Sequence, residues 1–225
     1  MKRYFLSAAF LAGALSPVVA ADLAPVESPP AISAPAAFDW NGFYLGGNVG
    51  GGRADVDWTY QPFGETAHHD GKGFLGGVQA GYNWQIDGFV IGAEADFLGS
   101  SIDGDTPCPN PAYSCTSDTK WLSTVRARAG YSFDNLLVYA TGGLGIGRFE
   151  IKTDDGAGTS GSTIRNDTGW VAGAGVEYGF SPNWSIKAEY MHHDFGERTY
   201  TVDGGNPVDA DFRFDTSKIG VNYRF

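Results

Sequence analysis

Apolar and polar residues alternate along most of this chain with a period of two. The pattern is cleanest in the last seven residues, where the apolar positions are Ile219, Val221, Tyr223 and Phe225. About seven upstream segments, each of roughly ten residues, show the same period. Alternation of this kind indicates β-strands with one face in apolar surroundings. We therefore expect an all-β fold of eight antiparallel strands that closes into an up-and-down transmembrane barrel.

The eight expected strands cover the ranges 40–53, 73–86, 89–97, 121–133, 138–147, 170–180, 184–193 and 218–225. Tight turns follow every second strand, at Asp87-Gly88, Asp134-Asn135 and Ser181-Pro182-Asn183. Between them lie four longer polar stretches, 54–72, 101–120, 150–167 and 196–211. Short turns on one side and long loops on the other are typical of outer-membrane barrels, with the short turns in the periplasm.

Large aromatic residues gather beside the tight turns. They are Tyr82, Trp84, Phe89, Tyr131, Phe133, Tyr178, Phe180, Trp184, Tyr223 and Phe225. These residues predict one aromatic girdle at the periplasmic interface of the membrane. A soluble β-sandwich is the alternative fold, but it would not gather its largest aromatics at one edge.

The first residues of the chain read as a secretory signal, residues 1–20. Lys2 and Arg3 precede an apolar stretch, and Val18 and Ala20 are small residues placed for cleavage after Ala20. Cleavage after Ala21 fits nearly as well. Residues 21–37 contain four prolines and many alanines, which predicts an extended periplasmic linker. The barrel is then expected over residues 38–225.

The amino-acid composition of the chain limits the kinds of partner that it is expected to bind. The formal net charge is −11, which argues against nucleic acid because phosphate contacts need clustered Lys and Arg. The chain has 33 glycines, which suit the tightly curved wall and narrow interior of a small barrel.

Nine charged residues are expected to point into the barrel. The acidic ones are Glu94, Asp96, Glu177 and Glu189, and the basic ones are Arg126, Arg128, Lys187, Lys218 and Arg224. The strands that hold Glu94 and Asp96 and those that hold Arg126 and Arg128 are neighbours, so these four residues should pair. Buried ions are tolerated only when paired, and an eight-stranded interior has room for little besides side chains. A charged plug is the favoured interpretation and an ion path the alternative.

At the level of whole segments the chain resembles a known family. The stretch FDWNGFYLGGNVGGGRA at residues 38–54, GGVQAGYNWQ at 76–85, the following strand with Glu94, and the final YRF are similar to the small outer-membrane β-barrel proteins of alphaproteobacteria. That family includes the major surface antigens of brucellae and rhizobia, often labelled porin family. The resemblance implies an OmpA-like eight-stranded barrel, an abundant envelope protein in contact with lipopolysaccharide, and, in some members, porin activity or haemin binding. It supplies no catalytic residues.

Other candidate sites are few. Cys108 and Cys115 lie in one long polar stretch, and an oxidising compartment favours a disulfide between them. They offer too few ligands for a metal. His68-His69 lie in the first long polar stretch and His192-His193 near the outer end of the seventh strand. Adjacent residues of a strand point to opposite faces, so two adjacent histidines are not expected to face one ion. No Ser-His-acid set assembles on the seventh strand, because Ser185 and Glu189 point in and His192 points out. We therefore expect no catalytic residues, no metal and no cofactor.

The sequence favours an outer-membrane protein with a structural, envelope-stabilising and surface-antigen role. A small-solute porin is the alternative, and a surface protein that binds haem or a host molecule is the second. The expected partners are outer-membrane lipids and lipopolysaccharide, periplasmic chaperones and the barrel-assembly machinery. That machinery would read Ile219, Val221, Tyr223 and Phe225 as an assembly signal.

Overall fold

The computed structural model describes residues 37–60, 65–107, 114–154, 160–202 and 206–225. The expected signal at 1–20, nearly all of the expected linker at 21–37 and Cys108 lie outside these ranges. Among the described residues, no helix is long and apolar enough to cross a membrane.

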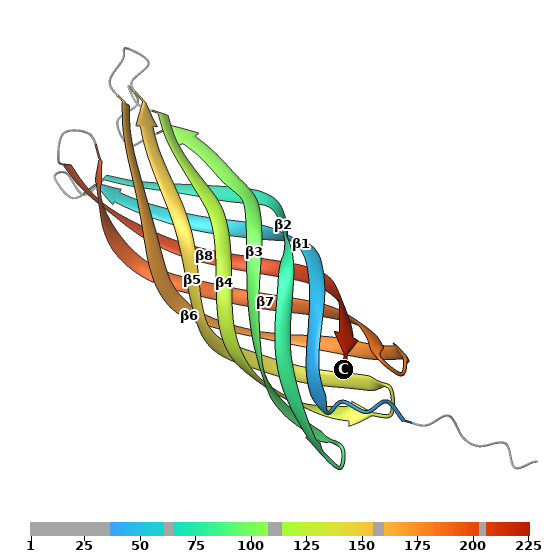
Figure 1. Ribbon diagram of the computed structural model, residues 1–225. Helices are drawn as coiled ribbons and strands as arrows, with labels where there is room; N and C mark the ends of the chain where they lie inside the picture. Colours follow the sequence, from blue (N-terminus) through green and yellow to red (C-terminus); the bar gives the residue numbers. More distant parts are fainter. Residues whose placement is uncertain (1–36, 61–64, 108–113, 155–159, 203–205) are drawn as a thin grey trace, which may run out of the picture. The chain divides into compact units, whose positions relative to one another are not determined.

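Eight antiparallel strands form one closed barrel in sequence order (Figure 1). They are β1 (Gly42–Tyr60), β2 (Glu65–Ile86), β3 (Phe89–Pro107), β4 (Ser114–Phe133), β5 (Leu136–Asp154), β6 (Ser160–Ser181), β7 (Trp184–Val202) and β8 (Asn206–Arg224). The barrel closes where β1 pairs with β8, from Tyr44 opposite Arg224 to Tyr60 opposite Val208. The expected fold class is confirmed.

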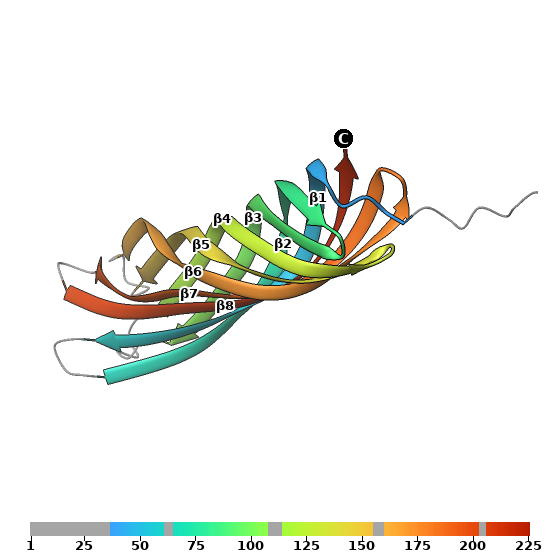
Figure 2. The ribbon, with the colours of Figure 1, turned by 90° about the horizontal axis from the view of Figure 1, so that it is seen from below.

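The three tight turns fall where the sequence placed them. Residues 87–88, 134–135 and 182–183 join β2 to β3, β4 to β5 and β6 to β7. Asp87 and Asp134 each have a φ of 54°, a left-handed conformation that Asp tolerates better than most residues. The end of β8 lies at the same end of the barrel as these turns (Figures 1 and 2).

The four long polar stretches are corrected by the structure, because most of each stretch is strand. β1 continues to Tyr60 and β2 begins at Glu65, which leaves only residues 61–64 between them. The strands have 19 to 22 residues, whereas crossing a bilayer takes about 9–11. Roughly half of each strand therefore lies beyond the membrane on the extracellular side.

Alternation continues in this outer half with its polarity reversed. On β8, Phe212 and Phe214 are buried inside the barrel while Arg213 between them is exposed. Inward apolar residues of β1 to β5 and β7 join those of β8 in an apolar cluster in the outer half of the lumen. We call it the outer core; its members are Ala54, Val56, Leu75, Leu98, Ile102, Leu122, Phe149, Ile151, Phe195, Tyr200, Ala210, Phe212 and Phe214. Because the residues that point outward in this half are polar, these segments were wrongly predicted to be loops.

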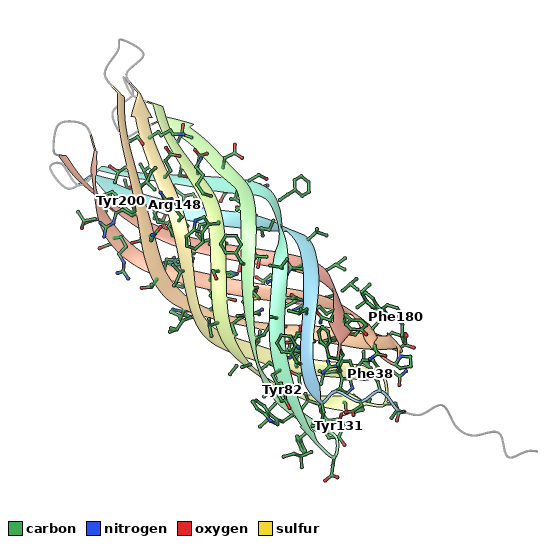
Figure 3. The ribbon with its side chains drawn as sticks, in the orientation of Figure 1. Phe38, Tyr82, Tyr131, Arg148, Phe180 and Tyr200 are labelled. Carbon is green, nitrogen blue, oxygen red and sulfur yellow. The ribbon has the colours of Figure 1, made fainter. Side chains whose placement is uncertain are left out.

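In the inner half, large apolar side chains cover the outside of the barrel. All ten aromatics of the expected girdle are exposed there, from Tyr223 at 37% to Phe225 at 68%. Figure 3 shows Tyr82, Tyr131 and Phe180 beside the end that carries the tight turns. A second, sparser ring of exposed aromatics marks the other edge of the apolar band, at Phe74, Phe97, Trp170 and Tyr190. The sequence argument did not identify this outer ring.

Candidate functional site

A layer of buried charges crosses the lumen between the two halves of the barrel. The strand register sets three opposite-charge pairs directly across from one another: Glu94 with Arg126, Glu177 with Lys187, and Glu189 with Lys218. Opposite charges at facing positions stabilise neighbouring strands. The strand register alone therefore places an acid opposite a base on neighbouring strands.

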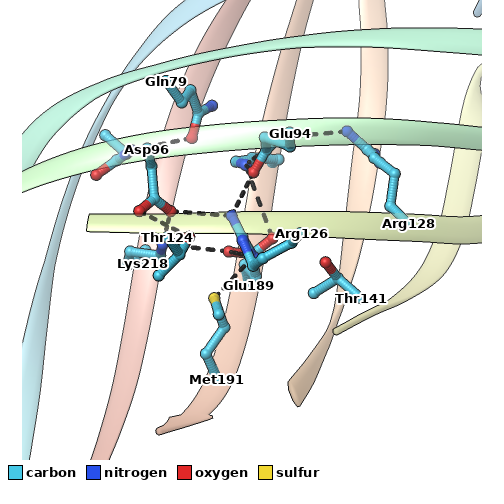
Figure 4. Close-up of polar contacts among 12 residues, drawn as sticks. Gln79, Glu94, Asp96, Thr124, Arg126, Arg128, Thr141, Glu189, Met191 and Lys218 are labelled. Carbon is cyan, nitrogen blue, oxygen red and sulfur yellow. Dashed lines mark hydrogen bonds and ion pairs between the residues drawn. The ribbon is translucent and has the colours of Figure 1, made fainter. Parts of the chain in front are cut away.

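Arg126 on β4 is the centre of the layer (Figure 4). One guanidinium nitrogen, Nη2, donates to Glu94 and, at 2.9 Å, to Asp96 on β3. The other, Nη1, donates to Glu189 on β7 at 2.9 Å. The planar fork of an arginine suits such multiple contacts with carboxylates. One cation thus links strands on separate walls of the barrel.

Arg128 lies two residues further along β4 and forms a second centre. Its Nη2 donates to Glu177 on β6 at 2.7 Å, and its Nη1 donates to the hydroxyl of Tyr44 at 2.9 Å. The guanidinium carbon also lies 4.0 Å from the centre of the Tyr139 ring. A cation over an aromatic face is stabilised by the ring quadrupole, so aromatic and acidic groups together hold this charge.

Two lysines complete the layer. Lys187 on β7 donates to both carboxylate oxygens of Glu94, at 2.8 and 3.0 Å. Lys218 on β8 lies 3.1 Å from Asp96 and 3.3 Å from Glu189. Four carboxylates therefore face four cations, and every one of these eight side chains is at most 2% exposed.

Neutral groups satisfy the remaining oxygens of the layer. Ser185 and Asn222 donate to Glu177 at 2.6 and 2.9 Å, and Thr124 donates to Asp96 at 2.9 Å. Tyr44 and Tyr139 donate their hydroxyls to Glu94 and Glu189, at 2.7 and 3.0 Å. Each carboxylate is thus paired and hydrogen-bonded, which is the condition for keeping buried charge.

Arg224 stands apart from the layer at the periplasmic end. Its Nη1 donates to the backbone carbonyl of Trp40, and its guanidinium lies 5.5 Å from the rings of Phe38 and Trp40. Phe38 and Trp40 are buried with Val90, Leu137 and Tyr139 in a small apolar cluster. We call it the inner cluster. The charged layer is therefore enclosed between the inner cluster and the outer core.

The structure brings together eight of the nine expected lumen charges, and only Arg224 lies outside the network. The sequence argument missed the hydroxyls of Tyr44 and Tyr139 and the contact of Met191 with Arg126. Tyr44 and Tyr139 stand an even number of residues from inward-pointing Asn48 and Thr141 on the same strands, so the alternation along each strand was the available signal. No pattern in the sequence predicts the contacts between strands that are not neighbours in the barrel.

The other expected sites are the cysteine pair, the apolar C-terminal residues and the histidine pair of β7. Cys108 and the side chain of Cys115 lie outside the described residues, so the disulfide remains a prediction. Ile219, Val221, Tyr223 and Phe225 all point outward on the membrane face. His192 and His193 point to opposite faces, and buried His193 lies 3.2 Å from the hydroxyl of Thr216.

The outer surface carries one cluster that the sequence argument did not assemble. Asp55, His68 and Asp70 have possible ligand atoms within 4.8 Å of one another, although the first long stretch was expected to be a loop. A hydrogen bond to Asp70 raises the pKa of the Asp55 carboxyl, and Arg53 lies 2.9 Å from Asp70. His68 lies 2.8 Å from Asp57, and this hydrogen bond raises the pKa of its imidazole. Asp70 is thus paired with Arg53 and Asp57 with His68, and Asp55 shares a hydrogen bond with Asp70.

Comparison with known proteins gives consistent matches over nearly the whole chain. The profile of the family described as "Outer membrane protein beta-barrel domain" matches residues 30–225. The 31 kDa outer-membrane immunogenic protein of Brucella melitensis is 36% identical over 92% of this chain and 93% of its own length. The 22 kDa outer membrane protein of Rhizobium leguminosarum is 31% identical over 84% of this chain and 80% of its own. Among solved structures, OprG from Pseudomonas aeruginosa aligns with a TM-score of 0.50 and 12% identity. It covers 84% of this chain and 98% of that one, a likeness of fold alone.

Proposed function

The chain belongs to the outer-membrane β-barrel domain family, and from this premise we propose that it is a closed barrel that stabilises the cell envelope. The charged layer carries the proposal, because its eight buried side chains link β3, β4, β6, β7 and β8 across the lumen. An eight-stranded barrel has an interior just wide enough for side chains. Apolar clusters on both sides of the layer support a lumen without a continuous polar path.

The closed lumen has a direct test. Purified full-length protein in a planar bilayer is expected to show little or no steady conductance, with small brief steps at most. Correct insertion is checked by the shift in gel mobility on heating. The matched variant Glu94→Ala/Lys187→Ala removes one acid and one base and is expected to show more frequent steps. Large, long-lived and reproducible channels from the unaltered monomer would contradict the proposal.

A small-solute porin is the second candidate, and one observation favours it. Within the described residues, the amide of Asn83 and the Nε and Nη2 atoms of Arg224 are buried without a hydrogen-bond partner. Such groups usually bind water, so the periplasmic half of the lumen is the part in which a polar path would begin. The same conductance trace separates the two candidates.

We also propose that the extracellular ends of the hairpins present the surface that immune systems would meet. The relative from Brucella melitensis carries the word immunogenic in its name. In this chain, Asp57 and His68 are exposed on the outward face near the β1–β2 connection. Antibodies raised against the folded barrel are expected to bind intact cells, and substitution of Asp55, Asp57, His68 and Asp70 should reduce that binding. Antibodies that bind only lysed cells would contradict this.

A further inference from the structure

The residues just before β1 cross the periplasmic end of the barrel. Residues 38–41 form no strand, yet Phe38 and Trp40 are only 6% and 0% exposed. Their ring centres lie 4.5 Å apart, and both rings belong to the inner cluster. Figure 2 shows the chain before β1 running across this end of the barrel, and Figure 3 places Phe38 beside the tight turns. We call residues 38–41 the strap.

Side chains from separate parts of the barrel hold the backbone of the strap. The backbone N–H of Phe38 donates to Oδ1 of Asn135 in the β4–β5 turn at 3.2 Å. The backbone N–H of Trp40 donates to Oε1 of Gln85 on β2 at 2.9 Å. The carbonyl of Trp40 accepts from Nη1 of Arg224 on β8. Because these anchors meet only in the closed barrel, the strap docks on a finished wall, and its release breaks no pairing between strands.

Two glycines give the strap its hinge and its seat. Gly42, the first residue of β1, has a φ of 106°, a conformation that glycine adopts far more readily than other residues. It turns the chain from β1 across the mouth. Gly179 on β6 lies under the ring of Phe38, because a Cβ added at Gly179 would lie 2.2 Å from Cδ2 of that ring. The ring therefore occupies the space that a side chain at position 179 would fill.

Polar groups without partners lie next to the strap. Asn83 is two residues from Gln85 on the inward face of β2 and is 0% exposed, and neither atom of its amide has a hydrogen-bond partner within the described residues. Arg224 is 4% exposed, and its Nε and Nη2 are likewise unpartnered. Docking of the strap buries two aromatic rings, which favours the closed mouth, but it keeps water from these polar groups, which opposes it. The docked and released states of the strap are therefore balanced by opposing contributions.

We propose that the strap is a releasable cover of the periplasmic mouth. Docked, it seals the space around Asn83 and Arg224 with the rings of Phe38 and Trp40. Released by rotation at Gly42, it admits water and small anions to these groups, while the charged layer stays closed. Anions are favoured because Arg224 lies outside the balanced layer of four carboxylates and four cations. The inference concerns the periplasmic end alone and does not depend on whether the charged layer conducts ions.

The test measures how fast a thiol at position 83 reacts in the full-length protein in nanodiscs. Asn83→Cys is introduced together with Cys108→Ser/Cys115→Ser, so that it supplies the only thiol. The reagent is 2-sulfonatoethyl methanethiosulfonate, a small anion. Gly179→Ala displaces the ring of Phe38 without changing the strap itself, and it is expected to raise the labelling rate by at least about tenfold.

Two further variants control this measurement. Gly47→Ala is the matched glycine control, because a Cβ at Gly47 would lie 3.7 Å from its nearest neighbour, and it should leave the rate unchanged. Phe38→Ala removes the anchor from the strap and should raise the rate as Gly179→Ala does, so the result does not depend on the folding of one variant. Heat-dependent gel mobility confirms that each variant is folded.

The labelling rate with the intact strap decides between a releasable cover, a permanent plug and an open mouth. Slow but complete labelling, faster in Gly179→Ala and Phe38→Ala, supports the proposal. A rate equal to that of a fully exposed thiol would show that the strap does not cover the mouth. Labelling that never occurs with the intact strap would show a permanent plug, and either result overturns the proposal. Equal rates with the anionic reagent and its trimethylammonium analogue would overturn the preference for anions at Arg224.

Discussion

Arg126 on β4 and Glu189 on β7 meet across the lumen, with Nη1 of the arginine 2.9 Å from Oε1 of the glutamate. Two strands, β5 and β6, separate them along the wall, so the contact passes through the interior. Because Arg126 also pairs with Glu94 and Asp96 on its neighbour β3, it ties three parts of the circumference together. Such a tie resists flattening of the barrel.

Replacing Arg126 with alanine is expected to destabilise the barrel strongly. The change leaves three buried carboxylates short of a partner, and breaking a buried pair costs about 3–5 kcal/mol. Urea unfolding, followed by the loss of heat-modifiable mobility, measures the effect. Arg148→Ala is the matched control, since Arg148 lies on the outer face of β5 and is partly exposed. Equal urea midpoints for the two variants would show that the layer is hydrated and the pairing unimportant.

The outer core predicts a second strong effect. Phe149 stacks on Phe212 and Phe214 with ring centres 4.8 and 5.5 Å apart, and it meets Phe195 edge-on at 5.0 Å. Phe149→Ala should lower the free energy of unfolding by about 3–5 kcal/mol, because it leaves a cavity in a packed core. Ile164→Ala on the exposed face of β6 is the control. If the outer half were flexible loop, both changes would be nearly neutral.

Phe225 is expected to be needed for assembly more than for packing. Its backbone N–H donates to the carbonyl of Phe43 at 3.1 Å, and its ring meets Tyr223 at 5.1 Å on the membrane face. Deleting Phe225 should lower the amount of heat-modifiable protein in the outer membrane. Phe180→Ala removes another exposed aromatic at the same end and should leave assembly near normal. Unchanged insertion of the truncated chain would remove the residue from the assembly signal.

His68 should titrate above the usual histidine range. The hydrogen bond to Asp57 raises its pKa, so protonation favours the folded state. The contribution is complete below the ordinary pKa and is lost as the pH rises through the raised value. NMR titration of the folded protein measures this pKa, and Asp57→Asn should return it toward 6.5. An identical titration curve in the variant would show that the contact does not persist in solution.

The alternation of inward and outward positions along each strand explains which parts of the structure could be predicted from the sequence. Glu94, Arg126 and Lys187 occupy inward positions of clearly alternating strands, so their common location followed from the period of two. Their exact partners did not, because β3, β4 and β7 come together only when the barrel closes. The alternation indicates that a side chain points inward, but it does not indicate that Lys187 contacts Glu94 while Lys218 contacts Asp96.

The outer half was misjudged for a different physical reason. Glu150 and Lys152 alternate with buried Phe149 and Ile151 as regularly as any inner segment, yet the charged residues of the stretch 150–167 were taken as a sign of a loop. A strand that has water outside the barrel keeps the period of two, but its apolar residues point into the barrel and its polar residues point outward. Lys120 and Gly196 add to the difficulty, because register shifts at Thr119–Trp121 and Asp194–Glu197 interrupt the count.

The reversal of polarity along each strand restricts which insertions and deletions the gene can accept. A one-residue slip of β8 would turn Phe214 toward water and, in the same movement, Lys218 toward lipid. Both errors arise together, so neither half can compensate for the other. Length changes within the strands should therefore survive in natural variants in steps of two residues, matched on the paired strand, whereas single-residue changes should be confined to the hairpin tips.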